Sequence, residues 1–196
     1  MYKKINQALF SEKELTDLLK AWIAISIAFA FVLPRSFGEN FLLSIITVGT
    51  GFVLHELAHR FVAKHYGCYA EFRSFDNMLM LAIVMAYFLK MVIAAPGAVM
   101  ISGPVGRTRN GKISAAGPAT NIILALIFLA VGKLTALSGL TADIVQYGFI
   151  INTWLALFNM IPFGLFDGKK ILNWNKFVYI GMVVVSLLLI LFVKVN

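Results

Sequence analysis

Long apolar runs alternate with short polar segments along the chain, and the runs have the length of membrane-crossing helices. A helix rises about 1.5 Å per residue, so about 20 residues cross a hydrocarbon core of about 30 Å. Apolar runs near that length occupy residues 18–33, 41–63, 113–131, 144–162 and 177–193. The pattern predicts an all-α polytopic membrane protein.

A further apolar run, at residues 78–91, is shorter than the others and carries Lys90 near its end. This favours a short, tilted or re-entrant element over a full crossing. The flanking segments look like strands, because residues 69–75 alternate aromatic and polar side chains and residues 98–102 lie between Gly and Pro turn signals. We therefore expect about five to six transmembrane helices, with a small membrane-associated β element between the second and third core helices.

The predicted organisation is a single integral membrane domain with a core at residues 41–170. The β or re-entrant insert occupies residues 69–102, and a C-terminal transmembrane helix occupies residues 177–193. Residues 1–20 are polar and charged, which is not the pattern of a cleaved signal peptide, so we expect them to form a cytoplasmic leader.

Composition supports a membrane protein, since 60% of the 196 residues are hydrophobic, 13% are charged and the mean hydropathy is +0.86. Soluble domains have about 45–50% apolar residues, so an ordinary water-soluble globule is excluded. The net charge of +8 suits cytoplasmic loops and anionic lipid better than nucleic acid, because no basic stripe is interleaved with aromatic residues. The lipid bilayer is therefore an expected partner, and nucleic acid is not.

The distribution of Lys and Arg orients the chain, because short cytoplasmic loops are enriched in both. If the leader is inside and residues 78–91 do not cross, only Arg35, Lys133 and Lys194 of the assignable basic residues lie outside. A hairpin whose return limb is residues 94–102 is the alternative. We expect a multi-pass protein of the cell membrane.

The three histidines of the chain lie close together in and after the second apolar run. His55 and His59 frame the pattern HExxH, with Glu56 between them. Residues four apart share one face of a helix, so two imidazoles can bind one zinc ion while the glutamate acts on a metal-bound water. An ionisable group at the bilayer centre costs about 2.5–3.5 kcal/mol, which indicates a functional site. The alternative is that these groups lie at the helix end among headgroups, as we expect for His65, which projects from a different face.

A catalytic zinc ion usually takes a third protein ligand and keeps one position for water. Asp167 is the favoured candidate, because Pro162 and Gly164 interrupt the fourth apolar run and let its carboxylate turn inward. Without the histidines, the Asp-Gly pair at this point would be taken as a simple turn. Glu71 and Asp76 are the alternative ligands.

Three motifs occur together in this chain. They are HExxH at residues 55–59, N-x-x-P-x4-D-G at residues 159–168 and A-G-P-A-T-N at residues 116–121. In this combination the chain resembles the site-2 protease family of intramembrane zinc metalloproteases, in particular its compact archaeal and bacterial forms. The resemblance implies that Asp167 is the third zinc ligand and Glu56 the catalytic base. It also implies that the substrates are transmembrane helices, cut within or near the bilayer.

Asn121 and Asn159 carry amides within apolar runs, which suits them to hydrogen bonding with an unwound substrate backbone or the developing oxyanion. Ordinary interhelical hydrogen bonding is their alternative role. A substrate helix must also be held extended for attack, and the strand-like residues 98–102 could pair with it edge to edge.

These features predict an intramembrane zinc metalloendopeptidase that hydrolyses peptide bonds of transmembrane-helix substrates. Its active site is expected to open toward the cytoplasmic side, where Arg60 and Lys64 end the HExxH helix. One alternative is a catalytically silent membrane scaffold that uses the same side chains only to bind a metal. Another is an HExxH membrane peptidase with other substrates, although its third ligand is usually a later Glu and none follows Glu71.

Overall fold

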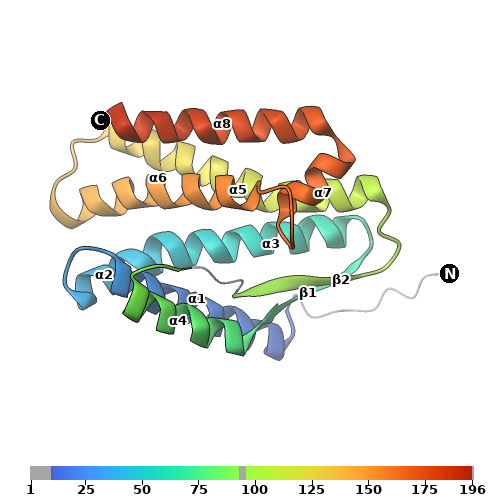
Figure 1. The fold of residues 1–196 in the computed structure, drawn as a ribbon, viewed down its shortest axis with the longest axis horizontal. Helices are drawn as coiled ribbons and strands as arrows, with labels where there is room; N and C mark the ends of the chain where they lie inside the picture. The colour runs from blue at the N-terminus through green and yellow to red at the C-terminus, as the bar shows by residue number, and fades with distance from the viewer. Residues whose placement is uncertain (1–9, 93–95, 196) are drawn as a thin grey trace.

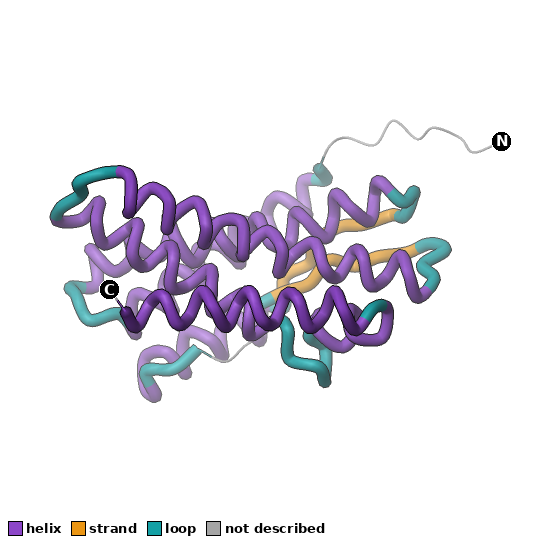
Figure 2. The backbone as a smooth tube through the Cα atoms, turned by 90° about the horizontal axis from the view of Figure 1, so that it is seen from above, coloured by secondary structure: helices purple, strands orange, loops and turns teal. Residues whose placement is uncertain are grey.

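The computed structural model describes residues 10–92 and 96–195, and most of them are helical (Figures 1 and 2). In chain order the elements are α1 (Glu12–Val32), α2 (Phe37–Ser44), the π-helical turn η1 (Ile45–Gly49), α3 (Thr50–His65), β1 (Tyr69–Ser74), α4 (Asp76–Leu89), β2 (Gly97–Ser102), α5 (Arg107–Leu134), α6 (Gly139–Asn159), α7 (Asp167–Trp174) and α8 (Lys176–Val195). Figure 1 shows the long helices stacked with nearly parallel axes, from α8 at the top through α5, α6 and α3 to α1 and α4. Helix α5 is central, because it packs against α3, α6 and α7.

Three helices are long and apolar enough to cross a membrane: α1, the continuous helix Phe37–His65 formed by α2, η1 and α3, and α5. The crossings expected at residues 144–162 and 177–193 lie on α6 and α8, which fall short of that criterion in the described residues. Helix α6 contains polar residues such as Asn152, whereas α8 is apolar over Lys176–Leu191 and its side chains beyond Leu191 lie outside the described residues. In the described residues three helices are therefore candidate membrane crossings, and the further crossings stay predictions.

Helix α1 begins inside the segment that we expected to be a leader. The Ser11 hydroxyl caps it by accepting a hydrogen bond from the Glu14 backbone N–H at 3.1 Å. A serine oxygen at this position satisfies one of the backbone donors that a helix start leaves free. The helix therefore starts at Glu12, and residues 1–9 of the expected leader lie outside the described part of the chain.

The helix that carries HExxH contains the π turn η1, and α1 packs closely against it there. The Ile45 carbonyl accepts hydrogen bonds from the Trp22 indole N–H at 2.9 Å and from the Thr50 hydroxyl at 3.0 Å. Gly49 faces the Trp22 ring, where a Cβ would clash. The missing side chain thus lets α1 approach the helix one turn before the histidines.

The strands expected at residues 69–75 and 98–102 are confirmed as β1 and β2. They pair antiparallel, with Phe72 opposite Val99. The sheet lies between α3 and α1 and contacts both (Figure 1). Helix α4 occupies the insert between the strands, and residues 94 and 95 of the expected return limb lie outside the described residues.

Candidate metal centre

Helix α3 places His55 and His59 one turn apart, with their Nε2 atoms 3.0 Å from each other. The Oδ2 atom of Asp167, at the start of α7, lies 3.4 Å from His55 Nε2 and 3.0 Å from His59 Nε2. All three side chains are buried, and their ligand atoms lie within 4.8 Å of one another. We call these three residues the His–His–Asp group. Such a group could hold a metal ion.

The other acids considered as ligands lie elsewhere. Glu71 is paired with Arg73 on β1, and its pKa is lowered because hydrogen bonds and this cation outweigh the effect of burial. Asp76 accepts hydrogen bonds from Ser74 and Lys20 at the start of α4. Neither carboxylate belongs to the His–His–Asp group, so the structure brings together the favoured candidate and not its alternatives.

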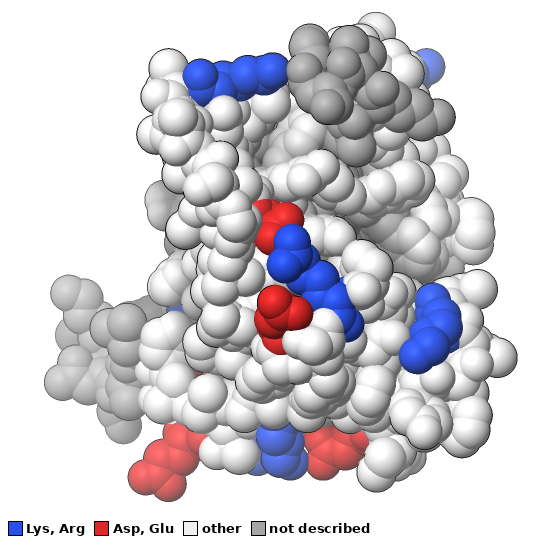
Figure 3. Space-filling model, turned by 90° about the vertical axis from the view of Figure 1, so that its left-hand side faces the viewer, with Lys and Arg blue, Asp and Glu red and all other residues white. Residues whose placement is uncertain are grey.

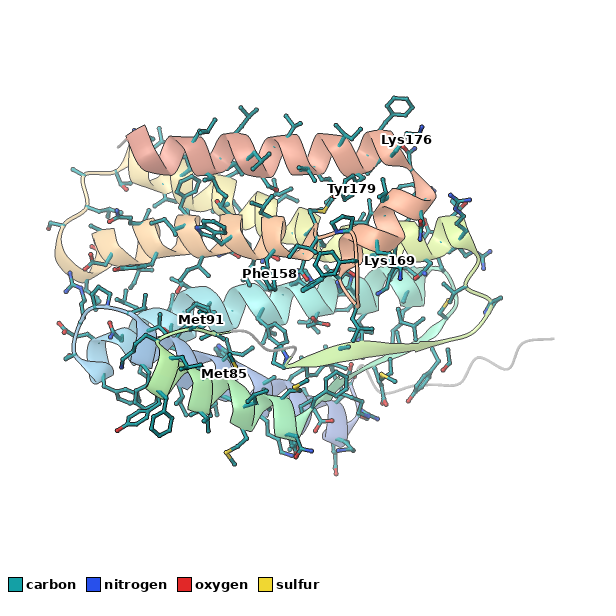
Figure 4. The ribbon with its side chains drawn as sticks, in the orientation of Figure 1. Met85, Met91, Phe158, Lys169, Lys176 and Tyr179 are labelled. Atoms are coloured by element: carbon teal, nitrogen blue, oxygen red, sulfur yellow. The ribbon has the colours of Figure 1, made fainter. Side chains whose placement is uncertain are left out.

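The loop between α6 and α7 turns Asp167 toward the histidines. Helix α6 ends at Asn159, and Gly164 adopts a left-handed conformation with φ +62° in the loop. Gly168 lies against the Met160 backbone carbonyl, which a Cβ at this position would strike. The helix break expected from the Pro and Gly residues is therefore present. In Figure 4 the labelled Phe158 and Lys169 lie near the two ends of this loop.

Helix α5 provides the hydrogen-bond partners of the Nδ1 atoms of both imidazoles. His55 Nδ1 lies 2.6 Å from Asn121 Oδ1, and His59 Nδ1 lies 2.8 Å from the Ile113 carbonyl oxygen. Gly117 on the same helix faces the metal-binding atoms, since a Cβ there would lie 2.5 Å from His55 Nε2 and closer still to His59 Nε2. Both histidines thus present Nε2 toward one point, and a glycine leaves the space around it open.

The donor set fits zinc. Catalytic zinc sites use three protein ligands drawn from His, Cys and carboxylates, and metal-binding histidines usually donate their second N–H to a carbonyl or carboxylate oxygen. Both features occur here, together with the space beside Gly117. Three protein ligands would leave a fourth position for water.

Glu56 follows His55 on α3. Its side chain is buried, and α3 contacts β2 of the sheet. The HExxH glutamate is therefore adjacent to the His–His–Asp group, on a helix that contacts the strand expected to hold a substrate.

The two asparagines expected at the site differ in their surroundings. Asn121 is fully buried, and its Nδ2 donates to the Gly51 carbonyl at 3.2 Å and to Asn152 Oδ1 at 3.0 Å. Asn159 is half-buried at the end of α6, and its Nδ2 donates to the Leu155 carbonyl of its own helix at 2.9 Å. The structure thus brings Asn121, but not the Asn159 amide, into contact with the His–His–Asp group.

Sequence reasoning missed Asn152, which is fully buried on α6. Its signal was present, because it is an amide in the middle of an apolar run. Its hydrogen-bond partner, Asn121, could not be known without the packing of α5 on α6. His65 is exposed beside Tyr66 at the end of α3, as its helical position suggested.

No family model matches the chain, and no solved structure matches it. A protein of Methanocaldococcus jannaschii that is named as an inferred zinc metalloprotease is 41% identical over 171 residues, which are 87% of this chain and 88% of the relative. A second protein of the same organism, named zinc metalloprotease, is 26% identical over 121 residues, or 62% of this chain and 30% of that protein. The first similarity extends over nearly the whole of both chains. The chain therefore belongs to the zinc metalloproteases, with zinc as its cofactor.

Proposed function

We propose that the protein is an intramembrane zinc endopeptidase that hydrolyses peptide bonds of transmembrane-helix substrates. The observation that carries this proposal is the position of the His–His–Asp group, whose two histidines lie on the apolar helix Phe37–His65. A hydrolytic site on a membrane-crossing helix is accessible chiefly to substrates that share the bilayer. Bound zinc would lower the pKa of a water molecule toward about 7 and polarise the scissile carbonyl.

The protein side chains have separate tasks in this proposal. His55, His59 and Asp167 hold the ion, and Glu56 takes the proton of the attacking water and passes it to the leaving amine. Asn159, at the end of α6 near the loop, is a candidate hydrogen-bond partner for the substrate backbone. Asn121 is a second candidate for this role, but its contacts with His55, Gly51 and Asn152 favour the orientation of His55 instead.

The outer edge of β2 is the proposed docking site for an extended substrate. The Phe72 N–H donates to Glu14 Oε1 at 3.0 Å, so the backbone of Phe72 points away from β2. In an antiparallel pair the opposite residue then also points outward, which directs the backbone groups of Val99 away from β1. Helix α3, which carries Glu56, contacts β2. A substrate strand added at this edge would lie next to the proposed catalytic base.

We further propose that the site opens toward the cytoplasm. Basic residues gather at the end of the molecule that carries the His–His–Asp group, where α5 begins with Arg107 and Arg109 and α7 carries Lys169 and Lys170. Figure 3 shows the opposite end, where basic and acidic side chains form a mixed group at the centre of a largely uncharged surface. This asymmetry follows the positive-inside rule.

Cleavage of a transmembrane-helix substrate by the purified protein in lipid vesicles tests the proposal. We expect zinc-dependent cleavage, which a chelator abolishes and Glu56→Gln reduces by at least about 100-fold, the lower range for a general base. Glu12→Gln is the matched control, because Glu12 is an exposed acid on α1. Glu56→Gln should retain its zinc.

Each outcome separates the alternatives. Equal cleavage by the parent and Glu56→Gln would overturn the catalytic proposal. Normal zinc binding without cleavage of any substrate would favour a metal-binding scaffold. Cleavage of soluble peptides at the same rate as membrane-embedded ones would favour a peptidase with other substrates.

A further inference from the structure

Asn152 belongs to a chain of hydrogen bonds that ends at Nδ1 of His55, the ring nitrogen on the side away from the metal-binding Nε2. Its Nδ2 donates to the Gly148 carbonyl of α6 at 2.8 Å, and its Oδ1 accepts from Asn121 Nδ2 at 3.0 Å. Asn121 in turn meets His55 Nδ1. Both asparagines are fully buried, so neither amide can exchange these partners for bulk water. Three helices, α6, α5 and α3, thus contribute to one continuous polar path.

Two backbone carbonyls fix the direction of every bond in this path. A carbonyl oxygen can only accept, so the amide nitrogen of Asn152 must face Gly148 and that of Asn121 must face Gly51. The Asn121 oxygen is then left for His55. Because that oxygen also can only accept, the proton of a neutral His55 ring must be on Nδ1, and the lone pair must be on Nε2.

We propose that Asn152 is a positioning residue that holds His55 in its metal-binding tautomer through Asn121. A zinc-binding imidazole must present an unprotonated nitrogen, and partners of its other nitrogen set which tautomer is present. Asn152 occupies the second N–H of Asn121, so the Asn121 oxygen is kept toward His55. The inference rests only on the metal-binding part of the proposed function.

Gly51 provides a second way to disturb the same path. A Cβ at Gly51 would lie 2.6 Å from Asn152 Oδ1, so Gly51→Ala displaces this amide without removing any hydrogen-bonding group. Thr153 provides the control. It is equally buried on α6, and its hydroxyl donates to the Phe149 carbonyl at 2.8 Å, outside the path to His55.

The first test is the zinc affinity of the purified full chain, measured by competition with a chromophoric chelator. We expect Asn152→Leu to bind zinc about 10-fold more weakly, the lower range for loss of an outer partner of a ligand. Gly51→Ala should weaken zinc binding in the same direction, whereas Thr153→Val should match the parent. In an Asn152→Ala background, Gly51→Ala should have little further effect, because the displaced amide is already gone. Parent-like affinity in Asn152→Leu would overturn the proposal.

The second test reads the tautomer directly, by nitrogen NMR of metal-free protein labelled with 15N-histidine. With three histidines in the chain, a His65→Gln variant simplifies assignment. We expect the His55 proton on Nδ1 in the parent and a population with the proton on Nε2 in Asn152→Leu. A parent His55 protonated on Nε2 would overturn the proposal, even if the Asn152 variant fails to fold.

Neither measurement depends on proteolysis. If the parent cleaves no transmembrane helix while both tests give the expected results, the proposed function fails and the role of Asn152 stands. If the parent cleaves such a helix and either test fails, the reverse holds.

Discussion

Two buried polar clusters meet on adjacent residues of α3, and they are built in opposite ways. The His–His–Asp group includes His59. The next residue, Arg60, donates from Nη2 to Glu14 Oε2 at 3.0 Å, and the Phe72 N–H donates to the other oxygen of the same carboxylate at 3.0 Å. We call this second cluster, Glu14 with Arg60 and the Phe72 N–H, the Glu14 clamp. Its two charged side chains are 0% and 1% exposed.

The difference lies in what each cluster lacks. In the Glu14 clamp a cation and an N–H face both oxygens of one anion, so its charges are balanced within the chain. In the His–His–Asp group, two imidazole nitrogens and a carboxylate oxygen converge, and both imidazoles direct their other nitrogen at an acceptor on α5. Three electron-pair donors that face one another are stabilised by a cation among them. The first cluster is complete as a structural element, and the second is completed by zinc.

Breaking the Glu14 clamp should have the largest effect on stability. Arg60→Met leaves the buried Glu14 carboxylate without its cation, and we expect a loss of about 3–5 kcal/mol in the free energy of unfolding, measured by denaturant titration in detergent. The exposed Lys169→Met is the control. Glu14→Gln combined with Arg60→Met should recover much of the loss, because Gln keeps an oxygen for the Phe72 N–H. A double variant as unstable as Arg60→Met alone would contradict this account.

Zinc binding to the His–His–Asp group should have the next largest effect on the stability of the folded protein. At a free zinc concentration 100 times its Kd, binding stabilises the folded protein by about 2.7 kcal/mol. A chelator should therefore lower the Tm of the parent and of His65→Gln, but barely that of Asp167→Asn. Equal chelator shifts in all three proteins would place the zinc elsewhere.

A substitution at Gly117 tests whether the ion lies in the space beside this residue. Gly117→Ala puts a methyl group against both Nε2 atoms, and we expect overpacking to cost about 1–3 kcal/mol of stability and to weaken zinc binding. Gly181→Ala on α8 is the matched control, because a Cβ there would meet nothing within 4 Å. Unchanged zinc affinity in Gly117→Ala, measured by chelator competition, would show that the ion does not lie beside α5.

The sequence was most informative where local geometry decides the outcome. The spacing of His55 and His59 follows from the helical repeat, and the turn at Asp167 follows from the Pro and Gly residues before it. The Glu14 clamp could not be predicted in this way, since its charged partners are 46 residues apart in the chain. Glu14 lies within the expected leader, and Arg60 is expected at the cytoplasmic end of the HExxH helix, yet each is buried against the other. Pairing between distant helices carries no periodic signal in either segment.

An exposed ion pair offers the smallest effect and the sharpest contrast with the Glu14 clamp. Asp76 accepts from Lys20 Nζ at 3.1 Å, but both side chains are largely exposed, so solvent screens the pair. Hydrogen bonds from Ser74 and then Lys20 lower the pKa of Asp76. A lowered pKa in the folded state contributes stability above the unfolded value of about 3.9, and this is lost as the pH falls through the folded value. Asp76→Asn should therefore be slightly less stable than the parent at pH 7 and equal to it near pH 2, in the same unfolding assay. If Asp76→Asn lost as much free energy of unfolding at pH 7 as Arg60→Met, burial would not explain the difference in strength between the two ion pairs.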